Sequence, residues 1–184
     1  MHGETRLKPA AATPASPWLT RWLPLAPTGA TVLDVACGWG RNLRWMQAAG
    51  YHVTGIDRDI AAVSDAAGAE IIEADLEDGS PWPLPGRRFD VVLVSRYLYR
   101  PLFPVLEKSM AKGGLLIYET FMQGNEKFGR PRNPDHLLKP GELLGAFPNL
   151  SVVAFEQGEV ETCGTGVVQR IVLSKDAAPR RLDL

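Results

Sequence analysis

The sequence predicts an α/β protein: one domain in which a mostly parallel sheet carries helices on both faces. Short apolar segments alternate with helix-compatible segments five times from residue 31 onward, and such alternation builds parallel sheets through crossover connections. The length of 184 residues suits a single domain, and 45% hydrophobic with 22% charged residues is ordinary for a globular protein. No internal repeat or second composition regime divides the chain. We therefore expect a flexible tail at 1–15 and a single domain at 16–184.

The first expected element is a short amphipathic helix. Ser16 can cap it, Pro17 fits the first helical position, and apolar residues follow at helical spacing up to Leu23. Pro24 ends it. This helix either covers the sheet or forms the roof of a ligand cleft.

Strands and helices then alternate. The glycine at position 50 is placed to end the first crossover helix, Gly113-Gly114 turns the chain into the fifth strand, and residues 76–88 form a loop around Trp82. The fourth strand is almost entirely apolar, as expected for a strand buried on both faces. The expected strands are Thr31–Asp34, Tyr51–Ile56, Ile71–Ala74, Phe89–Val94 and Leu115–Tyr118, followed by a closing antiparallel pair at Val152–Glu156 and Val167–Leu173. The expected helices are Arg41–Ala49, Ile60–Ala67, Pro101–Met110 and Pro140–Phe147.

The most informative segment is Thr31-Val-Leu-Asp-Val-Ala-Cys-Gly-Trp-Gly-Arg-Asn42. A strand, a turn with Gly38 and Gly40, and a helix start bring backbone N–H groups toward a nucleotide-like ligand. The dinucleotide fingerprint G-x-G-x-x-G is incomplete, because Leu43 stands at its third small position. Asp34 lies near the end of a buried strand, where a carboxylate is costly without a partner. A cationic ligand group over the strand end would supply that partner.

Three acids follow the first three strands: Asp34, Asp57 and Asp75. Ligands of open α/β sheets bind outside the carboxyl ends of the strands, so these side chains are expected to lie together. Asp57 stands 17 residues after Gly40, close to the spacing at which an acid meets ribose hydroxyls. Asp75 could accept from an adenine amine while the Leu76 N–H donates to a ring nitrogen. Taken singly, each acid could equally be a helix cap or a loop residue.

The runs VLDVACGWGRN, VTGIDRD, EADL, FDVVLVS and MAKGGLLIYET resemble the ordered motifs of class I S-adenosylmethionine-dependent methyltransferases. The resemblance covers Thr31–Thr120 and is nearest to the small bacterial tellurite-resistance-type branch. It implies a Rossmann-like three-layer sandwich with seven strands in the order 3-2-1-4-5-7-6, the seventh antiparallel. It also implies S-adenosyl-L-methionine as cofactor. Trp39, between the glycines, departs from the usual small or polar residue. By resemblance, the cofactor-binding residues are Asp34, Ala36, Gly38, Gly40, Arg41, Asn42, Ile56, Asp57, Arg58, Ala74, Asp75, Leu76, Ser95 and Arg96.

Arg41, at the start of the first crossover helix, could bind the methionine carboxylate or could be a solvated helix residue. Methyl transfer from a sulfonium depends mainly on positioning, and a general base is needed only for a protonated acceptor. After the fourth strand the chain reads Ser-Arg-Tyr-Leu-Tyr-Arg, without the Asn-Pro-Pro-aromatic run of amino-group methyltransferases. Candidates for a catalytic role are Arg96, Tyr97 and His136. The irregular segment 121–139, which contains Phe121, Phe128, Arg130 and Asn133, is expected to form a substrate lid.

The leading hypothesis is a methyltransferase acting on a small thiol, a metalloid oxyanion or a similar acceptor. A methyltransferase of RNA or protein is the alternative, and a non-catalytic S-adenosylmethionine-binding protein is the alternative from another class. The net charge of -1 does not favour a nucleic-acid partner. The two cysteines and three histidines suggest neither a disulfide framework nor a metal site. No apolar run reaches membrane-spanning length and the start lacks a signal-peptide core, so we expect a cytoplasmic monomer or homodimer.

Overall fold

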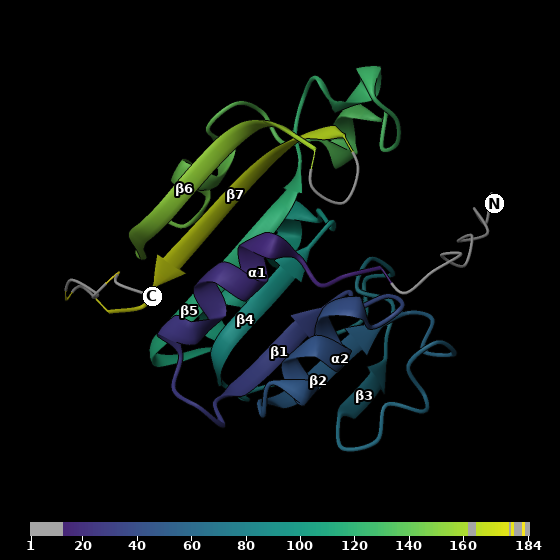
Figure 1. Ribbon diagram of the computed structural model, residues 1–184, viewed down its shortest axis with the longest axis vertical. Coiled ribbons are helices and arrows are strands. Elements are labelled where there is room, and N and C mark those ends of the chain that lie inside the picture. The colour runs from purple at the N-terminus through teal and green to yellow at the C-terminus, as the bar shows by residue number, and fades with distance from the viewer. Residues whose placement is uncertain (1–12, 162–164, 177, 179–181, 183–184) are drawn as a thin grey trace.

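A computed structural model describes residues 13–161, 165–176, 178 and 182 (Figure 1). A seven-stranded sheet in the order β3-β2-β1-β4-β5-β7-β6 forms its centre, which confirms the expected order. Strands β1 to β5 pair in parallel, and β7 is antiparallel to both β5 and β6. The strands are β1 (Thr31–Val35), β2 (His52–Asp57), β3 (Glu70–Glu73), β4 (Phe89–Ser95), β5 (Met110–Phe121), β6 (Ser151–Val160) and β7 (Gly166–Ser174). The expected flexibility of the tail concerns mainly residues 1–12, which lie outside the described residues.

Helices cover both faces of the sheet and bury two apolar clusters. In Figure 1, α1 (Pro17–Trp22) crosses in front of β4 and β5, and α2 (Arg41–Ala48) crosses in front of β1 and β2. Their apolar residues join one cluster with the side chains on that face of the sheet. The other cluster takes Leu106 from α3 (Phe103–Lys108) and Leu143 from α4 (Glu142–Ala146). The result is the expected three-layer sandwich.

The N-terminal helix begins and ends as its sequence predicts. The Ser16 side chain accepts from the amides of Trp18 and Leu19, Pro17 takes the first helical position, and a 3-10 turn through Leu23–Leu25 finishes the element. Trp18 is 1% exposed, and its indole N–H donates to the Ile171 carbonyl of β7 at 3.4 Å. The first helix is thereby attached to the last strand.

The prediction of a helix over Ile60–Ala67 is wrong, because this segment forms consecutive turns. Side chains of α2 take its carbonyl groups, because Arg44 donates to the Ala62 carbonyl and Gln47 donates to the Ala67 carbonyl, both at 2.9 Å. Other carbonyls of the segment accept local turn bonds, as Ile60 does from Val63 and Val63 does from Ala66. Local turns and tertiary bonds together thus stand where an alanine-rich sequence favours helical i→i−4 bonds.

Other boundaries shift without changing the architecture. The helix expected over 101–110 is a 3-10 turn (Arg100–Leu102) followed by α3, and Met110 already belongs to β5. Gly113-Gly114 lies within β5, at a register shift where the partners of β4 move from Met110 to Leu115. This local irregularity takes the place of the expected turn before the strand.

Candidate active site

The turn after β1 is tied to the end of β2. Ala36, Gly38 and Gly40 all have positive φ, at 55°, 56° and 74°. A Cβ on Gly40 would lie 2.5 Å from the Val63 side chain, so only glycine fits there. The Gly38 amide donates to Asp57 Oδ2 at 2.7 Å. The carboxylate at the end of β2 therefore holds the glycine turn in place.

Asp57 and Asp75 line a common cleft of about 450 Å³ at the carboxyl edge of the sheet. Asp57 is 2% exposed, and its Oδ1 accepts from the Asp59 amide at 3.1 Å. Asp75 is exposed and accepts from the Glu77 amide at 2.9 Å. Both carboxylates retain lone pairs for a ligand, because each oxygen can accept more than one hydrogen bond.

The third acid, Asp34, lies in β1 and does not line the cleft. It is 2% exposed, and its Oδ2 has no hydrogen-bond partner in the part of the chain that the structure describes. Burial raises the pKa of Asp34 to about 7; the Arg41 guanidinium opposes this and the Asp57 carboxylate adds to it. Asp34 is thus a buried acid in which one carboxyl oxygen accepts no hydrogen bond from the described residues.

A polar chain joins α2 to the ends of β4 and β5. Arg41 donates to Ser95 Oγ at 2.9 Å, and Ser95 donates to Glu119 Oε1 at 2.8 Å. Arg41 and Glu119 also form an ion pair at 3.7 Å, with both side chains largely buried. Glu119 was not among the predicted cofactor or catalytic residues, and it lies inside a β5 that runs three residues beyond its expected end.

The four polar residues after β4 point to different places. Arg96 has φ 57°, donates its amide to the Glu119 carbonyl at 2.9 Å and lines the cleft, as does Tyr97. Burial is the main cause that raises the pKa of Tyr97, and nearby Glu77 adds to it. Tyr99 lines a neighbouring hollow with Arg58 and Trp82 instead.

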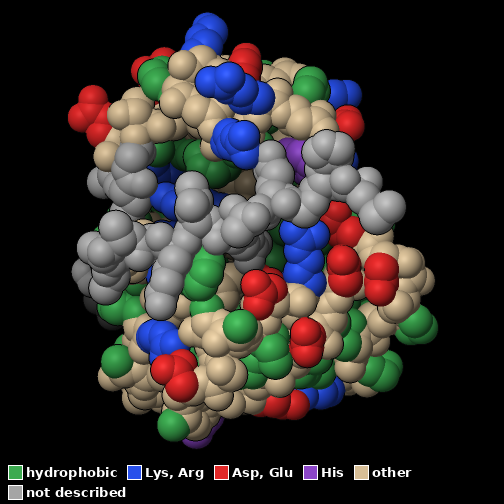
Figure 2. Space-filling model, turned by 90° about the vertical axis from the view of Figure 1, so that its right-hand side faces the viewer, with side chains coloured by type: hydrophobic (Ala, Val, Ile, Leu, Met, Phe, Trp, Pro, Cys, Tyr) green, Lys and Arg blue, Asp and Glu red, His purple; other side chains and the backbone are tan. Residues whose placement is uncertain are grey.

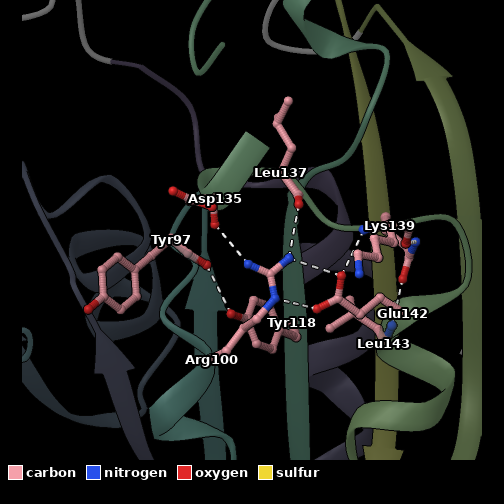
Figure 3. A network of polar contacts seen from close by, with 9 residues as sticks. Tyr97, Arg100, Tyr118, Asp135, Leu137, Lys139, Glu142 and Leu143 are labelled. Carbon is pink, nitrogen blue, oxygen red and sulfur yellow. Dashed lines mark hydrogen bonds and ion pairs between the residues drawn. The ribbon is translucent and has the colours of Figure 1, made fainter. Parts of the chain in front are cut away.

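Arg100 does not reach the cleft, although its position in the sequence allowed a substrate role. Its guanidinium binds Glu142 at 2.6 and 3.0 Å and donates to the carbonyls of Asp135 and Leu137 at 2.8 and 3.0 Å (Figure 3). Tyr118 donates to the Tyr97 carbonyl beside this network. Arg100 therefore fastens the base of segment 121–139 to α4.

Segment 121–139 is ordered by its own contacts with β7. Asn125 is 1% exposed, its Oδ1 accepts from the Val167 amide and its Nδ2 donates to the Pro131 carbonyl. Pro131 and His136 line the cleft, whereas Phe128 is 42% exposed. The segment thus supplies one wall of the cleft, and its role as a lid remains a prediction.

Figure 2 looks onto this edge of the molecule, where both acidic and basic side chains reach the surface. The cleft brings together seven of the predicted cofactor residues: Ala36, Asp57, Arg58, Ala74, Asp75, Leu76 and Arg96. The other seven do not line it. Asn42 is 4% exposed and accepts from the Ser16 amide at 2.9 Å, so it joins α2 to α1.

Comparisons with known proteins relate the chain to methyltransferases. The region 32–111, which runs from β1 to the start of β5, matches the family model of a methyltransferase domain. This match agrees with the resemblance of the sequence motifs to class I methyltransferases. No curated protein sequence matches the chain. S-adenosylmethionine is the methyl donor of this class.

Solved structures share the methyltransferase fold at low sequence identity. An S-adenosylmethionine-dependent methyltransferase from Methanosarcina mazei is 17% identical, with a TM-score of 0.68, covering 88% of this chain and 98% of its own. A TehB-like methyltransferase from Corynebacterium glutamicum is 19% identical, with a TM-score of 0.63, over 86% and 87% of the two chains. TehB from Haemophilus influenzae is 16% identical, with a TM-score of 0.63. The match to TehB covers 80% of this chain and 58% of the TehB chain.

Among the described residues, no group of three His, Cys, Asp or Glu side chains could hold a metal ion. No helix in the described ranges is long and apolar enough to cross a membrane.

Proposed function

We propose that the methyltransferase transfers a methyl group from S-adenosylmethionine to a small-molecule acceptor, such as a thiol or a metalloid oxyanion. The single observation that carries this proposal is the composition of the cleft at the carboxyl edge. Its lining combines Asp57 at the end of β2 and Asp75 after β3 with Arg96, Tyr97 and His136. The two acids suit the hydroxyl and amino donors of a nucleoside, and the arginine and histidine suit an electron-rich acceptor.

The residues of this chain fit the cofactor. Asp57 would accept from the ribose hydroxyls and Asp75 from the adenine amine, with the neighbouring Leu76 amide as a donor. The unmet Asp34 Oδ2 fits a cationic group, because an ammonium near it would offset the cost of a buried carboxylate. When bound, the cofactor supplies a methyl group on a sulfonium, which is already activated for transfer.

The catalytic work of the chain is then mainly positioning. Holding an acceptor in line with the methyl carbon can supply roughly 7–11 kcal/mol of the barrier. Arg96 would orient an anionic or thiolate acceptor. His136, at the rim, would take a proton from an acceptor that arrives protonated. The segment 121–139 would close over both.

The first experiment measures calorimetric binding of S-adenosylhomocysteine, the demethylated product. We expect saturable binding that Asp57→Asn weakens at least tenfold and that Asp65→Asn, an exposed acid paired with Arg44 away from the cleft, leaves unchanged. Absence of binding by the unmodified protein would refute the proposal.

The second experiment incubates the protein with labelled S-adenosylmethionine and a panel of thiols, metalloid oxyanions, RNA and protein. Mass spectrometry locates the label. Label in a small molecule supports the proposal, and label only in RNA or protein favours the macromolecular alternative. Binding without transfer to any acceptor favours a non-catalytic role.

A further inference from the structure

A second, smaller hollow of about 40 Å³ adjoins the cleft and is assigned no role by the function proposed above. It shares Arg96, Thr120 and Phe121 with the cleft. Its far wall comes from β7 and from the end of β6, and the first turn of α1 closes it. The hollow is therefore a side chamber of the cleft on the β7 side.

The side chains that line this chamber carry a formal charge of +2. They include three arginines, Arg41, Arg96 and Arg170, and one acid, Glu119. Glu119 is already hydrogen-bonded to Ser95 and ion-paired with Arg41. A chamber with this excess of guanidinium groups and with apolar neighbours such as Phe121 attracts an anion more strongly than an open surface would.

Arg170 reaches the chamber from β7, the last strand in the sequence. Its guanidinium carbon lies 5.7 Å from the centroid of the ring of Trp18, a buried residue of α1. Its Nε is buried and has no hydrogen-bond partner within the described ranges. A buried donor without an acceptor costs about 1–3 kcal/mol. The cation–π contact with Trp18 restrains the guanidinium, and the planar fork of arginine N–H donors matches a planar, bidentate acceptor.

We propose that the chamber binds a carboxylate group of the methyl acceptor and that Arg170 is the residue that recognises it. This inference rests on the function proposed above. The volume admits a group of only a few atoms, and the planar fork of arginine matches a carboxylate.

The position of the chamber favours the acceptor over the cofactor. Asp57 closes β2, and Arg170 lies on β7, four strands away in the sheet order. At a strand spacing of about 4.8 Å, the two backbones are roughly 19 Å apart. A nucleoside held at Asp57 thus leaves the β7 side of the edge for a second molecule. The acceptor carries its carboxylate there and presents its reacting atom toward the cleft.

The test uses the full chain with S-adenosylhomocysteine bound, and it probes the chamber with mercaptoacetate. 2-Mercaptoethanol, which has the thiol but no carboxylate, is the comparison ligand. We expect calorimetry to show saturable binding of mercaptoacetate, weakened at least tenfold by Arg170→Gln and about threefold to tenfold by Arg170→Lys. Binding of 2-mercaptoethanol should be weaker in the unmodified protein and unchanged by either substitution.

The matched control is Arg21→Gln. Arg21 also stacks on a tryptophan of α1, at 4.8 Å from the Trp22 ring, but it lies on the surface and pairs with Glu156. We expect this variant to bind mercaptoacetate like the unmodified protein. Unchanged S-adenosylhomocysteine affinity in Arg170→Gln shows that the variant is folded.

Three results would overturn the inference. The first is a failure of mercaptoacetate to bind the unmodified protein saturably, and the second is equal binding of mercaptoacetate to the Arg170→Gln and unmodified proteins. The third is a loss of affinity of Arg170→Gln for S-adenosylhomocysteine but not for methylthioadenosine, which lacks the amino-acid part, because the chamber would then hold the methionine carboxylate. If S-adenosylhomocysteine itself does not bind the unmodified protein, the function proposed above is refuted, and the inference about the chamber is refuted with it.

Discussion

Replacing Asp34 by asparagine tests the energetics of the buried acid. The carboxyl is fully enclosed, and its pKa lies at about 7 rather than 3.8. Between these two pH values the folded chain holds a proton that the unfolded chain has lost, so stability falls as pH rises. The loss is complete above pH 7 and amounts to about 4 kcal/mol, at roughly 1.4 kcal/mol for each tenfold change. Asparagine keeps the shape of the protonated acid and cannot ionise.

The assay is urea unfolding of the unmodified protein and of Asp34→Asn from pH 4 to pH 8.5. Subtracting the two curves removes the contributions of all other titrating groups. We expect the variant to gain about 0.5 kcal/mol at pH 4, about 2 kcal/mol at pH 5 and about 4 kcal/mol at pH 8. A difference that stays constant over this range would refute the assignment of a raised pKa to Asp34.

Three further predictions concern the charge of Asp34, the hydrogen bonds of Arg100 and the positive φ of Ala36. In the unmodified protein, the affinity for S-adenosylmethionine should rise between pH 6 and pH 8, because ionised Asp34 attracts the methionine ammonium; calorimetry at both pH values checks this, and Asp34→Asn should abolish the trend. Arg100→Lys should lower the free energy of unfolding by about 2 kcal/mol, since lysine cannot reproduce a fork that binds one carboxylate and two carbonyls. The exposed Arg44→Lys should change it by less than about 0.5 kcal/mol in the same urea titration. Ala36→Gly should raise the free energy of unfolding by about 0.5 kcal/mol, because relief of positive φ exceeds the added entropy of the unfolded chain; an unchanged urea midpoint would show that Ala36 is not strained.

The strands themselves and the placement of Asp57 and Asp75 could be predicted because they depend on local signals, whereas the order of the strands was implied by the resemblance of the motifs to those of methyltransferases. Apolar runs define the strands, and each acid follows its strand directly, so the parallel topology brings the two acids to one edge. The failed helix at 60–67 shows the limit of this reasoning. Its alanines favour a helix locally, but Arg44 and Gln47 of α2 take its carbonyls.

The β5–β7 side of the site could not be predicted for a different reason. Glu119 and Arg170 are opposed in the antiparallel pairing of β5 with β7, 51 positions apart in the sequence. Nothing near either residue signals that register. Arg100 likewise looked available for a substrate until the fold placed Glu142 beside it.

The bond from the Trp18 indole to the Ile171 carbonyl has a consequence for how the chain folds during synthesis. The surface that buries Trp18 and Leu19 includes residues of β7, which is synthesised after the other six strands. Until β7 is synthesised, Trp18 and Trp22 of α1 lack part of the apolar surface on which they pack. A growing chain therefore exposes both side chains to water and to other chains. Closing so long a loop is slow, so arrest of translation before residue 171 should yield an aggregation-prone intermediate rather than a smaller folded unit.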